Sequence, residues 1–355
     1  MRKVDSEVAE QRKEKILQAI IYHYIHTEKP VSSQIINKDY EIDLSSASIR
    51  NIMVQLEKEG YLTTQHVSSG RMPTDKGYRW LVDSLMELQS LALEERRKII
   101  EEYKSRINEF NELFVRTSHL LATLSNCAGF VIAPNINKSK LKLLHLMKLA
   151  EDRVLVIIVT HQGFVQHNVI LTDYDADEHL LNDISQILNE KFKDSTISEL
   201  TNKLPDIIHE IEYRHKELNK FIKLLSNQLN RQAPDDEIFL EGMDKMLPKL
   251  KIDDYKKLAS FIQLIEHKKL LRQVIEEDFS KMLNTHVTIG KEHHMPELND
   301  VSLIKTVYKL GEEPVGILGI IGPKRMEYPK MISLVNFVAS TINKIFNKIV
   351  GEKAR

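Results

Sequence analysis

Hydrophobic positions in the first 60 residues recur with the period of an α-helix. Ile16, Ile20 and Tyr24 fall four residues apart and predict a buried stripe on a helix over residues 10–26. The stretch TEKP ends this helix, and VSSQIINKDY predicts a short second helix with a serine N-cap. LSSASIRNIMVQLEKE predicts a third helix, again capped by serine, which Gly60 ends.

The third predicted helix has two different faces. At the helical period, Ile49, Met53 and Leu56 share one side, and small or polar residues occupy the other. A helix that enters the DNA major groove needs short side chains near its N-terminus, together with Arg, Asn or Gln to bond base edges. An ordinary solvated face would explain the same pattern for this helix alone. From the helix and its context we predict base-reading by Ser48, Arg50, Asn51 and Gln55.

The context is a predicted β-hairpin after the third helix. YLTTQHVSSGRMPT combines strand-forming residues with a turn at Ser68-Ser69-Gly70, and a fourth helix begins after Thr74. Three helices followed by a hairpin form the order of a winged helix-turn-helix. We therefore predict contacts with the DNA backbone by Ser46, Ser68, Ser69, Arg71, Lys76 and Arg79.

In the remainder of the chain, the spacing of hydrophobic positions changes from helical to strand-like and back to helical. The stretch from residue 83 to residue 128 contains no Gly or Pro and is densely charged, which predicts a connecting helix. Strand-like runs begin near Phe130 and return at HVTIG, VSLIKTVYKL and PVGILGIIGP, before a final helix. An antiparallel sheet that is split along the sequence and flanked by helices predicts an α+β domain with an insertion.

Composition and charge narrow the possible functions. The chain has 355 residues, of which 42% are hydrophobic, enough for two or three domains with their own cores. VLVIIV and VGILGIIG are too short to span a bilayer, and the N-terminus lacks the apolar core of a signal peptide, so we expect a cytoplasmic protein without a membrane partner. Residues 1–85 carry equal numbers of basic and acidic residues. A DNA-binding prediction must therefore depend on local pattern rather than on bulk charge.

Candidate catalytic and metal-binding residues are few. Cys127 is the single cysteine, which excludes an intrachain disulfide, and its position favours a small buried residue over a nucleophile. His293 and His294 are adjacent, with His286 nearby, but neighbours in a strand point to opposite faces and no HExxH spacing joins them. GIIGPKR lacks the Lys-Ser/Thr of a phosphate loop, and no GxSxG occurs. We expect no enzyme activity, no metal and no cofactor. A structural or chaperone-like protein would explain the helices but not the hairpin.

Several sequence blocks are far more specific than a general helix-turn-helix. EKPVSSQII, LSSASIRNIMVQLEKEGYL, SSGRMPTDKGYRWLVD and PVGILGIIGPKRMEYPKMISLVNFVA resemble the HrcA family of heat-inducible transcription repressors, which turn off bacterial chaperone operons. The similarity runs through nearly the whole chain. Two positions depart from the family pattern: Ile52 stands where an Asp is common, and PVSS stands for Pro-Val-Gly-Ser. Ile52 borders the core face, so we expect a variation in packing there.

This resemblance implies a multidomain α+β fold. It implies a winged helix-turn-helix DNA-binding domain over 1–88, a connecting helix over 89–128, a GAF-like domain over 129–174 and 246–355, and an inserted dimerisation domain over 175–245. It also implies a homodimer that binds an inverted-repeat operator in double-stranded DNA upstream of chaperone (heat-shock) operons, is inactivated by heat and is reactivated by a GroE-type chaperonin. The alternative is a ligand-responsive winged-helix repressor that senses a small molecule through its GAF-like domain.

Overall fold

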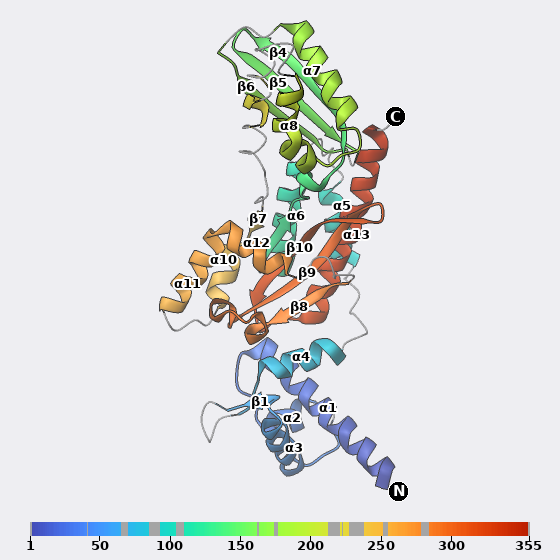
Figure 1. Ribbon diagram of the computed structural model, residues 1–355. Helices are drawn as coiled ribbons and strands as arrows, with labels where there is room; N and C mark the ends of the chain where they lie inside the picture. Colours follow the sequence, from blue (N-terminus) through green and yellow to red (C-terminus); the bar gives the residue numbers. More distant parts are fainter. Residues whose placement is uncertain are drawn as a thin grey trace.

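The fold consists of three units that follow one another along a long axis (Figure 1). The structure is a computed structural model and describes residues 2–40, 42–64, 70–84, 93–103, 110–161, 163–173, 177–211, 221, 223–226, 238–250, 255–277 and 284–353. We refer to residues 2–84 as the N-terminal unit, to residues 93–132 and 238–353 as the central unit, and to residues 139–226 as the insert. No described helix is long and apolar enough to cross a membrane.

The N-terminal unit contains four helices and one pair of short antiparallel strands. Its elements are α1 (Arg2–Thr27), α2 (Ser33–Asp39), α3 (Ser46–Lys58), β1 (Leu62–Thr63), β2 (Met72–Pro73) and α4 (Asp75–Ser84). Ser32 and Ser45 cap α2 and α3, because each side chain accepts a hydrogen bond from the backbone N–H three residues later. Gly60 follows α3 with a φ of 81°, a left-handed conformation that glycine adopts without strain. The predicted caps and the glycine stop are confirmed.

The central unit is a five-stranded antiparallel sheet between two layers of helices. The strand order is β7-β3-β10-β9-β8, with β3 (Ala128–Ile132), β7 (Ile238–Glu241), β8 (His286–Ile289), β9 (Val301–Leu310) and β10 (Glu313–Pro323). Side chains alternate between the layers: Val131 packs in a core with α6 (Phe110–Ser125) and α13 (Tyr328–Lys353), whereas Phe130 packs in a core with α11 (Tyr255–Glu266) and α12 (Lys268–Glu276). The shorter elements are α5 (Leu93–Glu102), α10 (Met243–Met246), η2 (Leu247–Lys249), η4 (Gly290–His293) and η5 (Pro296–Leu298).

The insert has its own sheet and its own core. A three-stranded antiparallel sheet of β4 (Leu141–Ala150), β5 (Arg153–Thr160) and β6 (Val165–Leu171) packs one face against α7 (Glu178–Lys191) and α8 (Ile197–Ile211). Asn189 on α7 bonds both the N–H and the carbonyl of Leu144, which fixes the helix on the strand. The chain enters this unit through the short helix η1 (Ile136–Lys138) and leaves it before β7.

The structure confirms the α+β class but moves the limits of its parts. We predicted that residues 129–174 belong to the GAF-like sheet and that the insert begins at 175. Instead, β4, β5 and β6 pair in a sheet of their own, so the first part of the central sheet ends at Ile132 and the insert begins at residue 139. The second part of the central unit begins with β7 at Ile238, not at 246. Strand-forming residues predict a strand but not its partner, since pairing is decided by segments far apart in the sequence.

The prediction of a connecting helix over 89–128 is also corrected. Helix α6 is a packed element of the central unit, with Leu113, Phe114 and Leu121 buried against the sheet and α13. The prediction depended on the high density of charged residues, which lie on the exposed side of this stretch. Its apolar residues form a stripe on the other side and pack in the core.

Candidate nucleic-acid interface

Helix α3 buries one side and exposes the other. Ile49 and Leu56 are fully buried in the core that α3 shares with α1 and α2, whereas Arg50, Asn51 and Gln55 are exposed. This arrangement agrees with the faces predicted from the sequence. Ile52 is partly buried and packs against the core, which confirms that it borders the core face as predicted.

The side chains on the exposed face of α3 differ in the intramolecular hydrogen bonds that they form. Gln55 donates from Nε2 to Glu59 Oε1 at 2.9 Å, which uses one of its two N–H donors. Ser48 lies half-buried, and its hydroxyl is 2.9 Å from the hydroxyl of Ser45. Among the described residues, the Asn51 side chain has no hydrogen-bonding partner. Asn51 and Arg50 are therefore the side chains most available to a ligand on this face.

A hollow of about 430 Å³ opens beside the N-termini of α2 and α3. Ser33, Ser46 and Arg50 line it, and the hydroxyls of the two serines lie 3.0 Å apart. Gly70 also lines the hollow. A Cβ at this position would lie 2.6 Å from the backbone of Val31, so only glycine fits there. Amide donors at helix N-termini and serine hydroxyls suit a phosphate oxygen. Sequence reasoning missed Ser33 and Gln34 as lining residues, although the PVSS block at the start of α2 carried the signal.

Two of the predicted backbone contacts have structural roles at the base of the hairpin. Arg71 pairs through Nε with Glu57 Oε2 at 3.0 Å, and its backbone exchanges hydrogen bonds with Val31. Lys76 donates to the Glu59 carbonyl at 2.8 Å and lies 4.4 Å from the centre of the Tyr61 ring. Both side chains hold the end of α3 against the strands, and each keeps further N–H donors beyond these bonds. Ser68 and Ser69 lie outside the described residues.

The structure argues against the predicted phosphate contact of Arg79. Its guanidinium bonds both carboxylate oxygens of Glu292 on η4, at 2.8 and 2.5 Å, and the carbonyl of Val287. Arg79 therefore joins α4 to the central unit and does not belong to the α3 surface. No local pattern could reveal this partner, because the two residues stand 213 positions apart.

Further contacts attach the N-terminal unit to the central unit. Lys324 forms an ion pair with Asp75 at 2.9 Å, and Arg325 pairs with Glu28. The rings of Tyr78 and Tyr328 lie 5.9 Å apart in a core that runs through both units. The position of α3 is therefore fixed relative to the central sheet by both apolar and charged contacts.

We expect the Arg79–Glu292 pair to make stability depend on pH. Burial would raise the pKa of Glu292, but hydrogen bonds from Arg79 and from the Ile289 N–H outweigh it and lower the pKa. A lowered carboxyl pKa stabilises the fold above the unfolded value of about 4.3, and this stabilisation is lost as pH falls through the folded pKa. Glu292→Gln should therefore cost about 1 to 3 kcal/mol at pH 7, the range of a charge-assisted hydrogen bond.

Thermal unfolding of both proteins across pH 3 to 8 measures this effect. The two stability curves should converge at the acid end, where the wild-type carboxyl is protonated. A difference between the curves that is constant over the whole range would contradict an ionic role for Glu292.

The structure does not bring the candidate metal ligands together. No group of three or more His, Cys, Asp or Glu side chains in the described part of the chain could hold a metal ion. His293 is buried, and burial lowers its pKa to about 4, so it is a neutral core residue at physiological pH. Cys127 is buried as well, and burial raises the pKa of its thiol, which disfavours the reactive thiolate.

A family model matches part of the chain, and curated relatives align with nearly all of it. Residues 111–332 match the family model described as HrcA protein C terminal domain. A heat-inducible transcription repressor HrcA from Acetivibrio thermocellus is 33% identical over 97% of this chain and 98% of its own length. One of the same name from Clostridium botulinum (strain Alaska E43 / Type E3) is 34% identical over 95% of this chain and 97% of its own length.

The fold is also found in a solved structure. A crystal structure described as that of a hypothetical protein superposes with a TM-score of 0.66 at 23% identity, covering 95% of this chain and 98% of that chain. This similarity concerns the fold alone. Because the family model spans more than half of the chain and the curated relatives align over nearly all of it, the chain belongs to the HrcA family.

Proposed function

We propose that the protein is a sequence-specific repressor of heat-shock genes whose N-terminal unit is a winged helix-turn-helix. The observation that carries the proposal is α3, with Ile49 and Leu56 buried beneath it and Arg50, Asn51 and Gln55 exposed above. Such a helix can enter a major groove and bond base edges. The relatives named heat-inducible transcription repressor support the biological role, and members of this family are repressors rather than enzymes.

The DNA contacts follow from the position of each side chain. Ser48, Arg50, Asn51 and Gln55 are the proposed base readers. The hollow at the start of α2 and α3 receives a phosphate, which Ser33, Ser46 and the neighbouring helix N-termini would bond. Ser68 and Ser69 stay proposed wing contacts, and Arg71 contributes charge at the base of the wing.

Footprinting of the DNA upstream of chaperone operons tests the proposed role. We expect one protected inverted repeat, with protection on two major-groove faces one or more helical turns apart. Uniform protection of all fragments, or none, would contradict a sequence-specific repressor.

We expect Arg71 and Arg79 to differ in their effect on general DNA affinity. Arg71→Ala should weaken binding to operator and random DNA alike, and should lower the salt slope of binding by about 1, because one phosphate contact is lost. Arg79→Gln is the control and should leave the DNA affinity and its salt slope as in the wild type, because the Arg79 guanidinium bonds Glu292 in the central unit. Binding measured across a salt series checks both; equal slopes for wild type and Arg71→Ala would remove Arg71 from the interface.

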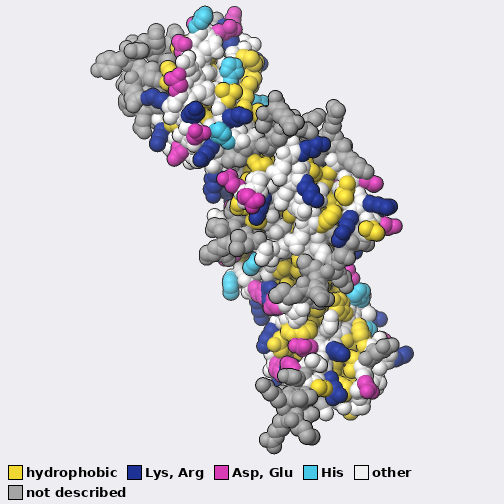
Figure 2. Space-filling model, turned by 90° about the vertical axis from the view of Figure 1, so that its right-hand side faces the viewer, with side chains coloured by type: hydrophobic (Ala, Val, Ile, Leu, Met, Phe, Trp, Pro, Cys, Tyr) yellow, Lys and Arg dark blue, Asp and Glu magenta, His cyan; other side chains and the backbone are white. Residues whose placement is uncertain are grey.

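The insert carries the feature that supports a homodimer. Six large hydrophobic side chains, Leu143 and Leu171 among them, are exposed on the sheet face opposite α7 and α8, from 42% to 67%. The others are Met147, Leu149, Val165 and Val169. The register aligns them across β5 in rows such as Met147–Leu155–Val169. Figure 2 shows hydrophobic side chains gathered along one edge of the upper unit.

A second copy of the chain is the proposed occupant of this open sheet face. Contiguous exposed apolar surface of this kind marks an interaction site. A palindromic operator is recognised by two recognition helices that are related by a two-fold axis. Contact between two identical sheet faces would produce a dimer with this symmetry. The insert would then be the dimerisation domain, and the central unit would be the GAF-like domain to which it is joined.

Control by heat and by a GroE-type chaperonin is the final part of the proposal. The relatives' name, heat-inducible transcription repressor, supports release of the operator on heating. Exposed apolar side chains on the insert suit recognition by a chaperonin when the dimer dissociates. Operator affinity that is the same before, during and after heating, with no response to added chaperonin, would contradict this control.

A further inference from the structure

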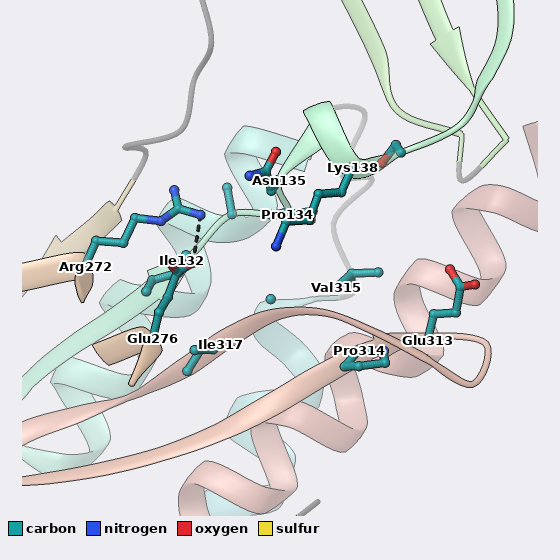
Figure 3. A pocket seen from close by; sticks show the side chains of 13 residues that line it. Ile132, Pro134, Asn135, Lys138, Arg272, Glu276, Glu313, Pro314, Val315 and Ile317 are labelled. Carbon is teal, nitrogen blue, oxygen red and sulfur yellow. Dashed lines mark ion pairs between the residues drawn. The ribbon is translucent and has the colours of Figure 1, made fainter. Parts of the chain in front are cut away.

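A cavity of about 370 Å³ lies where the chain leaves the central sheet for the insert (Figure 3). Its walls come from three segments: the link between β3 and β4, helix α12, and the start of β10. Its volume falls in the range of about 300 to 1,000 Å³ that is usual for small-molecule sites. The apolar part of the lining consists of Ile132, Ala133, Pro134, Pro314, Val315 and Ile317.

One wall carries a buried charge. Arg272 on α12 is only 7% exposed, and its Nη2 pairs with Glu276 Oε1 at 2.8 Å on the next helical turn. Glu276 is half-buried at the edge of the cavity. A buried guanidinium needs a partner to offset its lost hydration. The pair therefore fixes a charged, hydrogen-bonding wall on a single helix.

A second cation faces the same cavity from an independent segment. Figure 3 shows the Lys138 side chain directed from η1 into the space beside Arg272. The link that carries Lys138 is folded as a tight turn, because Asn135 accepts hydrogen bonds from the Asn137 and Lys138 N–H groups at 2.9 and 3.1 Å. Among the described residues, the Lys138 ammonium has no ion-pair partner. Two cations thus border one cavity.

The charges of the lining decide the class of ligand. Glu276 is paired with Arg272, and Figure 3 shows Glu313 on the opposite side of the cavity from that pair, at the start of β10. Beside the Arg272–Glu276 pair, the lining therefore presents the positive charge of Lys138 above an apolar floor. We propose that this cavity binds a small organic anion, whose carboxylate or phosphate group lies between Lys138 and Arg272 and whose apolar part lies on the floor.

Occupation of this site would join the link of the insert to the central unit. Lys138 belongs to the link, whereas Arg272 belongs to α12, so an anion bonded to both restrains the insert relative to the central sheet. The binding prediction does not depend on the DNA-binding proposal, because no lining residue belongs to the N-terminal unit.

Calorimetric titration of the full chain tests the proposal. The probes are butyrate, succinate, phenyl phosphate and inorganic phosphate, with butyramide and phenol as uncharged controls. We expect saturable binding of one organic anion per chain, tighter than that of inorganic phosphate and of the uncharged controls. The carboxylate and phosphate probes distinguish the two possible head groups.

Two matched variants locate the bound anion. Lys138→Gln should weaken binding at least tenfold, whereas Lys142→Gln, at an exposed position of β4 outside the cavity, should leave it unchanged. Both lysines are exposed, so neither change should lower the melting temperature of the free protein. Saturable binding by none of the anions, equal binding of the uncharged controls, or equal affinity for wild type and Lys138→Gln would each overturn the proposal.

Discussion

Val169→Arg is expected to convert the protein from a dimer to a monomer and to weaken operator binding by roughly 10³-fold or more, the usual margin between specific and non-specific DNA affinity. Val169 is 43% exposed and lies in the row Met147–Leu155–Val169 on the open face of the insert sheet. In the monomer an arginine there stays solvated, so the fold tolerates it. In a contact between two copies it would bring two like charges into an apolar interface, which is strongly unfavourable.

Sedimentation velocity and operator titration measure the two consequences together. Asp183→Arg serves as the control, since it adds the same side chain at an exposed position of α7, on the other side of the insert. The control should stay dimeric and bind normally. A Val169→Arg protein that sediments as a dimer would place the interface elsewhere; a monomer with full operator affinity would show that dimerisation is not needed for recognition.

Asn51→Ala is expected to weaken specific binding by about 1 to 3 kcal/mol, the contribution of one bidentate contact to a base. This corresponds to roughly 5- to 150-fold in affinity. Asn51 is exposed on α3, and within the described part of the chain its side chain has no hydrogen-bonding partner. Its removal therefore leaves the folded state intact, and the loss should appear only on the operator.

Competition between operator and random duplex measures this loss. The random-DNA affinity of Asn51→Ala should equal that of the wild type, because no phosphate contact is removed. Gln11→Ala, at an exposed position of α1, is the control and should match the wild type on both duplexes. Normal operator binding by Asn51→Ala would exclude this residue from the reading set.

Local signals explain why α3 could be predicted so closely. Serine caps, the helical period of Ile49, Met53 and Leu56, and the glycine stop all act within a few residues, and the observed helix runs from Ser46 to Lys58. The same holds for α2 and for the end of α1, whereas α1 begins at Arg2, eight residues before the predicted start, because the apolar stripe that predicts the helix covers only its second half. Sequence is most informative where each element's own residues determine its ends and its buried face.

Long-range pairing explains what the sequence did not predict. The sequences of β4 to β6 predict strands, but they do not predict whether these strands pair with the central sheet or form a separate sheet. Arg79 shared the charge and position expected of a phosphate contact, yet its partner Glu292 lies in η4. The cavity lined by Lys138 and Arg272 likewise unites distant segments. Such features arise only when the units fold together.

The most direct test of a dimeric, sequence-specific repressor is the fluorescence anisotropy of a labelled inverted-repeat duplex, compared with a scrambled duplex across a salt series. The account predicts a preference for the inverted repeat of roughly 10³ or more, with two chains bound per duplex. Equal binding to both duplexes, with the same decline as salt rises, would contradict it.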